Sequence, residues 1–163
     1  MEETIFLELY NQNHYNELIK YNLPKDQINF TALPAKAIEQ LSKRKDQENL
    51  KAITILLAEK PIGFFVLDYG KDKLELTDNI NSLLLRSLSM NPLYQGKGYG
   101  KKAMYLLDEF IKCNYTDIEE LVLAVNFKNK LAYQLYLKVG YEDNGKTRKW
   151  LQGFQYLLKK KLI

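Results

Sequence analysis

The feature that most constrains this chain is residues 95–100, which read Gln-Gly-Lys-Gly-Tyr-Gly. Three glycines at alternate positions allow backbone conformations that a side chain would forbid, and they leave the N–H groups open to an approaching anion. An amphipathic helix predicted over residues 98–112 brings the positive end of its dipole to the same place. Lys97, Lys101 and Lys102 add positive charge. The pattern therefore predicts a cradle for a pyrophosphate group.

Two other glycine patterns offer competing interpretations. Residues 98–103 fit the permissive G-x-G-x-x-A form of a dinucleotide-binding turn, which needs an acidic residue at the end of the next strand. Glu119 and Glu120 instead precede the next apolar run. Residues 140–147 match the triphosphate loop G-x-x-x-x-G-K-T in letters, but they follow a predicted helix and lead into a strand-like tail. Because that loop must follow a strand and open a helix, we interpret the match as chance.

The context of residues 95–100 resembles the signature of the GNAT superfamily of N-acetyltransferases. That signature is Arg/Gln-x-x-Gly-x-Gly/Ala after a strand that ends near an Asp/Asn-Pro pair, here Asn91-Pro92. A second block resembles the next strand, helix and closing strand of the same superfamily, with Leu123, Ala124, Val125, Asn126, Asn129, Ala132, Tyr136, Gly140 and Tyr141. The resemblance is close over residues 83–142 and extends to the N-terminal half only in the order of its elements.

The resemblance implies an α/β fold in a single domain over residues 1–163, a length that suits one domain. The GNAT fold has a central mixed, mostly antiparallel sheet of about six or seven strands, flanked by about four helices. A parallel pair of strands splays apart at the cofactor site. From periodicity alone, strands are predicted over residues 4–9, 51–59, 62–69, 83–90, 121–125 and 149–159, and helices over 14–21, 98–112 and 128–139. A further helix is entered near residue 34, and a further strand starts at residues 140–141.

The same resemblance implies acetyl-CoA as the cosubstrate and assigns its contacts. The expected cofactor-binding residues are Leu88, Met90, Gln95, Gly96, Lys97, Gly98, Tyr99, Gly100, Lys101 and Asn129. Tyr136 matches the tyrosine that protonates the departing thiolate, and a phenol with a pKa of about 10 suits that role. A backbone N–H near Met90 or Asn91 would stabilise the oxyanion. On physical grounds, Asn126 is favoured as the cap of the following helix.

The general base is not evident in the sequence. Many relatives place a carboxylate on the fourth or fifth strand, whereas these strands offer Arg86, Ser87, Ser89 and Ala124. Three alternatives stay open: a water relay to Glu119 or Glu120, a relay to the acceptor loop within residues 22–36, or use of the neutral amine. Arg86 would pair with a carboxylate on the acceptor if its side chain faced the cleft.

These features predict an N-acetyltransferase that moves an acetyl group from acetyl-CoA to a primary amine of a small molecule or peptide, by direct transfer. We expect residues 22–36 to select the acceptor. The alternative is a module that binds acyl-CoA without catalysis, which the missing carboxylate favours.

Composition excludes several other classes of function. The net charge of +4 is modest and shows no basic stripe with interleaved aromatics, so no nucleic-acid partner is expected. A single cysteine rules out an internal disulfide and a cysteine-based zinc site, and no metal is predicted. Since no apolar run approaches the roughly 20 residues of a membrane span, we expect a cytoplasmic protein without a membrane partner. A homodimer is left open.

Overall fold

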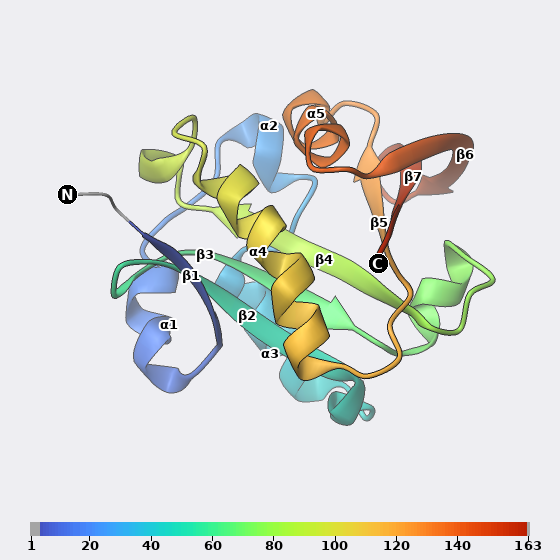
Figure 1. The fold of residues 1–163 in the computed structure, drawn as a ribbon. Helices are drawn as coiled ribbons and strands as arrows, with labels where there is room; N and C mark the ends of the chain where they lie inside the picture. The colour runs from blue at the N-terminus through green and yellow to red at the C-terminus, as the bar shows by residue number, and fades with distance from the viewer. Residues whose placement is uncertain (1–3, 163) are drawn as a thin grey trace.

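The computed structural model describes residues 4–162, so residues 1–3 and 163 of the predicted domain lie outside the description. The described chain forms seven strands, five α-helices and three short 3-10 helices (Figure 1). In chain order they are β1 (Ile5–Leu9), α1 (Gln12–Leu18), α2 (Lys25–Ile28), α3 (Pro34–Lys43), η1 (Gln47–Asn49), β2 (Leu50–Leu57), β3 (Lys60–Asp68), η2 (Lys71–Glu75), β4 (Ser82–Met90), η3 (Pro92–Tyr94), α4 (Tyr99–Asn114), β5 (Glu120–Asn126), α5 (Lys130–Lys138), β6 (Glu142–Trp150) and β7 (Gly153–Lys161). None of the helices formed by residues 4–162 is long and apolar enough to cross a membrane.

The strands form one mixed sheet in the order β1-β2-β3-β4-β5-β7-β6. Every neighbouring pair is antiparallel except β4 and β5, which are parallel. The prediction of a mostly antiparallel sheet with one parallel pair is therefore confirmed. The described residues contain one helix more than the expected four, because residues 25–28, predicted as a polar connector, form the single-turn helix α2.

Alternating side chains of the central strands build a core on each face of the sheet. Phe65 of β3 packs in the larger core with the buried side of α4, which includes Leu107. Phe64, which points to the opposite face, packs with Leu18 of α1 and Ala37 of α3. α4 accordingly crosses one face of the sheet while α1 and α3 cover the other (Figure 1). This two-sided cover explains why the strands read as apolar runs.

The C-terminal segment differs from its prediction. The strand expected to start at residues 140–141 is β6, but it extends to Trp150, and the final strand expected over residues 149–159 is β7, which begins at Gly153. The two strands form an antiparallel hairpin that turns at residues 151–152. β6 lies at the edge of the sheet and is exposed along much of its length. Because an edge strand needs no buried apolar face, its lysines and arginine gave no signal for how far the strand extends.

Candidate functional site

β4 and β5 pair only at their first residues and then separate. Their parallel register covers Ser82–Glu120, Leu83–Leu121 and Leu84–Val122, after which β5 remains paired with β7 alone. Beyond this point β4 contains a bulge against β3, where Ser87 takes a left-handed φ of 58°. A bulge bends its strand, and a left-handed non-glycine residue is strained, a combination found at functional sites. The predicted splay of the parallel pair is thus confirmed.

The glycine stretch forms an open turn directly before α4. Gly96 and Gly98 have φ values of 76° and 83°, and Gly98 is the N-cap of α4. A Cβ built on either glycine meets no atom within 4 Å, so the requirement for glycine is conformational and the surrounding space is free. Lys97 and Lys101 are exposed beside it. The unpaired first N–H groups of a helix, the dipole and these charges together fit an anion.

Some predicted cofactor residues have side chains committed elsewhere. The amide of Gln95 donates to the carbonyl oxygen of Met90 at 2.7 Å and exchanges two hydrogen bonds of 3.1 Å with Gln27 of α2. The side chain of Tyr99 is 8% exposed and packs in the larger core. The Leu88 carbonyl accepts a hydrogen bond from the Thr31 hydroxyl at 3.0 Å. Each carbonyl oxygen has two lone pairs, so the Met90 and Leu88 carbonyls can each accept one further hydrogen bond.

Tyr136 lies on α5 and is buried in the same core as Tyr99. Its ring meets that of Tyr141 edge to face at 5.4 Å between centroids. Burial raises the pKa of the Tyr136 phenol, so the group stays protonated at neutral pH. Asn129 is the N-cap of α5 and accepts from Ala132 N–H at 3.4 Å.

The structure corrects one sequence expectation around this site and narrows another. Asn126 does not cap α5, because its side chain bonds the Lys128 N–H and the Gln152 carbonyl. The Asn91 N–H donates to the Ile62 carbonyl at 2.7 Å, so of the two expected donors to the oxyanion only Met90 is kept.

Glu119 and Glu120 are also badly placed for a proton relay. Glu120 pairs with Ser82, eight residues from Met90, which corresponds to about 26 Å along an extended strand. It is 6% exposed and accepts from the Thr77 hydroxyl, while Glu119 accepts from Asn79 and Asn81. Both carboxylates therefore stabilise the closed end of the parallel pair.

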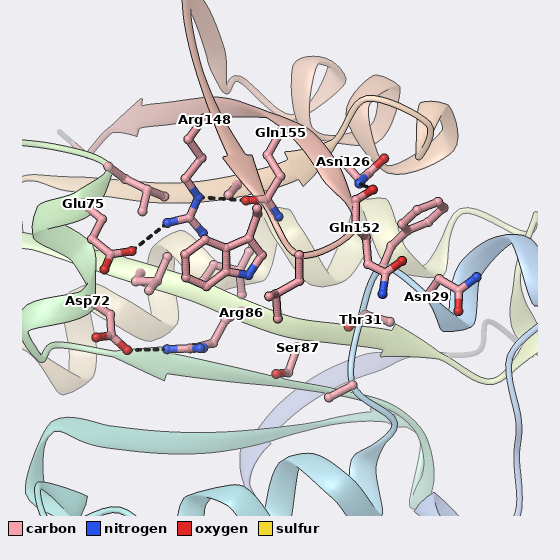
Figure 2. Close-up of a pocket in the computed structure, with 18 of the residues that line it drawn as sticks. Asn29, Thr31, Asp72, Glu75, Arg86, Ser87, Asn126, Arg148, Gln152 and Gln155 are labelled. Atoms are coloured by element: carbon pink, nitrogen blue, oxygen red, sulfur yellow. Dashed lines mark hydrogen bonds and ion pairs between the residues drawn. The ribbon is translucent and has the colours of Figure 1, made fainter.

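A cavity of about 540 Å³ opens where the two strands part (Figure 2). The segment expected to select the acceptor contributes residues 28–32 and Lys36. η2 contributes Asp72 and Glu75, while β4 contributes Arg86 and Ser87 on the floor of the view. The remaining wall comes from β5 and the C-terminal hairpin, with Ala124, Asn126, Arg148, Trp150, Leu151, Gln152 and Gln155.

The arginines and carboxylates of this cavity are arranged as ion pairs. Arg86 faces the cavity, and its Nη1 donates to Asp68 at 3.0 Å and to Asp72 at 2.9 Å. Arg148 donates from Nη1 to Glu75 at 2.9 Å. Burial lowers the pKa of the Arg148 guanidinium, Glu75 opposes this shift, and the charge of Arg86 adds to it.

The cavity residues of the hairpin were missed in the sequence. Arg148 and Trp150 are two residues apart on β6, a spacing that puts two side chains on one face of a strand. That signal was usable only if the strand predicted to start at residues 140–141 was followed as far as Trp150. The contact of this hairpin with η2 depends on tertiary packing, so no local sequence pattern predicts it.

Comparison with known proteins agrees with this geometry. Residues 11–141 match the family model described as the acetyltransferase (GNAT) family. A Bacillus subtilis (strain 168) protein described as uncharacterized N-acetyltransferase YbbJ is 37% identical over 97% of this chain and 98% of its own length.

Solved structures share the fold at low sequence identity. The aminoglycoside acetyltransferase AAC(6')-Ib, in complex with coenzyme A and kanamycin, superposes with a TM-score of 0.77 at 21% identity, over 97% of this chain and 95% of that one. Spermidine N-acetyltransferase from Vibrio cholerae, in complex with CoA and spermine, gives a TM-score of 0.68 at 16% identity over the same shares.

Proposed function

The chain belongs to the GNAT acetyltransferase family, and we propose that it transfers the acetyl group of acetyl-CoA directly to a primary amine of a small molecule or peptide. The observation that carries the proposal is the parallel pair β4–β5, which parts beside a glycine turn at the start of α4. The cofactor would enter this gap, with the acceptor in the adjoining cavity. The whole activity would reside in one domain over residues 1–163.

The residues around the turn fit coenzyme A. The backbone of Gly96, Gly98 and Gly100 would hold the pyrophosphate, with Lys97 and Lys101 beside it. Support comes from the empty space next to Gly96 and Gly98, which a side chain would fill. The pantetheine arm would follow β4 at Leu88 and Met90, and Asn129 would face it from the start of α5.

Acetyl-CoA supplies an activated thioester, and the chain would supply position and protons. Tyr136 would donate its proton to the departing thiolate. The raised pKa of Tyr136 makes it a weaker acid than a free phenol, yet a thiolate formed in the same apolar surroundings is also more basic than in water. Donor and acceptor remain matched, which is the condition for efficient general-acid catalysis.

The amine would react in its neutral form. Among the described residues, the carboxylates lining the cavity are Asp72 and Glu75, and each is already paired with an arginine. A carboxylate held in an ion pair is a poor base because protonation would break the pair. The site would therefore bind the small neutral fraction of the acceptor and need no general base.

The alternative function is binding of acyl-CoA without catalysis, and the lack of an unpaired carboxylate in the described cavity favours it. Calorimetric titration with acetyl-CoA tests both functions, followed by thiol release against a panel of amines, amino acids, polyamines and peptides. Binding with turnover on any member supports the transferase. Binding without turnover across the panel supports the binding module, and failure to bind acetyl-CoA overturns both.

A further inference from the structure

The polar side chains of the cavity separate into two groups. Arg86, Arg148, Asp72 and Glu75 gather on one side, whereas the opposite side carries the amides of Asn29, Asn126 and Gln152 (Figure 2). The amide side also holds Thr31, whose hydroxyl reaches the Leu88 carbonyl beyond the point where β4 and β5 part. An acceptor in this cavity would therefore meet neutral polar groups near the cofactor gap and charged groups farther away.

Among the described residues that line the cavity, the cations Arg86, Arg148 and Lys36 outnumber the carboxylates Asp72 and Glu75, and the two arginines have unused donors. Both cavity carboxylates are bound by guanidinium groups, and within residues 4–162 the Nη2 of Arg148 and the Nε and Nη2 of Arg86 have no hydrogen-bond partner. Lys36 also lines the cavity without an ion-pair partner in the described chain. A ligand with several ammonium groups would have to share these two carboxylates with the guanidinium groups. A carboxylate would find donors in the fork geometry that suits it.

We propose that the acceptor is an amine that also carries a carboxylate, and that Arg148 binds this carboxylate. The proposal rests on the proposed transferase function and names its substrate class. The amine lies at the Thr31 side of the cavity, toward the cofactor gap, and the carboxylate lies toward Arg148 and Arg86. It sets this chain apart from its structural neighbours, whose bound ligands include kanamycin and spermine.

Arg148 is held in place for such a role. The indole of Trp150 lies 4.2 Å from the guanidinium carbon, Nε donates to Gln155 at 2.8 Å, and Nη1 donates to Glu75. These contacts fix the fork while Nη2 remains available, so little side-chain freedom is lost on binding. The positive charge of Arg86 also acts on Arg148, and an anion beside them relieves that repulsion.

The test uses matched acceptors on the full-length protein. Amino acids and short peptides are compared with their own C-terminal amides, together with the diamines putrescine and cadaverine, in acetyl transfer and in calorimetric binding. We expect at least one acid to exceed its amide by about tenfold or more, because a charge-assisted hydrogen bond is lost in the amide. Equal or better use of amides or diamines overturns the proposal, as does a panel with no acid preference in either assay.

Two variants with opposite expected signs identify Arg148 as the group responsible. Arg148→Gln should weaken binding of the preferred acid by about 10- to 100-fold and leave its amide unchanged. Glu75→Gln removes the carboxylate that competes for Arg148 and should tighten binding of the acid a few-fold. A purely structural role for this pair would weaken acid and amide alike in both variants, which would overturn the assignment.

Lys112→Gln is the control, because it removes one positive charge at the exposed end of α4 and should change neither ligand. Acetyl-CoA titration of every variant distinguishes a failure of the transferase function from a failure of the proposed acceptor class. Loss of acetyl-CoA binding by the unmodified protein contradicts the transferase function itself. Transfer to diamines with no preference for acids contradicts only the substrate class.

Discussion

The glycine turn and the cavity lie on either side of the gap between β4 and β5, yet they are built in different ways. The turn presents backbone groups from one short segment, residues 95–100, and its key positions are two glycines with left-handed φ values. The cavity is lined by side chains from residue 28 to residue 155, and its charged groups are held in ion pairs between distant segments.

This difference indicates that the cavity, and not the turn, sets the specificity for the acceptor. A backbone site recognises a group shared by every form of the cofactor and tolerates changes in side chains around it. A site made of paired side chains changes its preference whenever one member of a pair is replaced. We expect substitutions in the turn to abolish binding of the cofactor, and substitutions in the cavity to redirect the choice of acceptor.

Gly98→Glu should have the largest effect and abolish acetyl-CoA binding in calorimetry. The substitution places bulk and negative charge at the N-cap of α4, where the dipole and the pyrophosphate would meet. The left-handed φ also costs about 1–2 kcal/mol for a residue with a Cβ.

Gly145→Glu is a matched control for that strain. Gly145 has a φ of 80° and no atom within 4 Å of its built Cβ, and it lies on β6 outside the turn and the cavity. Both variants should melt at similarly lowered temperatures, but only Gly98→Glu should lose the cofactor. Equal affinity for acetyl-CoA in the two variants would contradict the assignment of the turn.

Tyr136→Phe should lower turnover by roughly ten- to a thousand-fold, within the range that a general acid contributes, and leave acetyl-CoA affinity nearly intact. Tyr141→Phe provides the comparison, because the hydroxyl of Tyr141 is buried without a hydrogen-bond partner among the described residues. Removing it should keep turnover and stabilise the fold by about 1 kcal/mol. Similar turnover in both variants would assign Tyr136 to packing.

The same contrast between a local turn and a cavity built from distant segments explains which features could be predicted from the sequence. The turn, the strand before it and the helix after it are local patterns, so residues 95–100 and the parallel pair could be predicted from sequence. The bulge at Ser87 could not be, because a left-handed serine is imposed by the register of β3 and β4. Arg148 was equally hidden, since its partners Glu75 and Trp150 meet it only after β6 has joined the sheet.

The pH dependence of transfer distinguishes a neutral amine from a general base. If the chain supplies no base, kcat/KM should rise about tenfold per pH unit until the pH reaches the pKa of the acceptor amine. The raised pKa of Tyr136 also shifts the loss of activity at high pH upward. Its protonated form persists as the pH rises, so activity should not fall until well above pH 10, the ordinary range for tyrosine. A plateau that begins below the amine pKa would reveal a titrating base.

The smallest predicted effect concerns the paired amides of Gln27 and Gln95, which join α2 to the glycine turn. Gln27 belongs to α2 on the acceptor side, and Gln95 opens the turn while also holding the Met90 carbonyl. Gln27→Ala should weaken acetyl-CoA binding by only about two- to tenfold, the value of one or two net hydrogen bonds, and Gln95→Ala should cost more. A double-mutant cycle measured by calorimetry separates the shared term from the rest. A coupling energy near zero would mean that the two amides affect cofactor binding independently, whereas a coupling of about 1 kcal/mol would mean that α2 supports the turn through this pair.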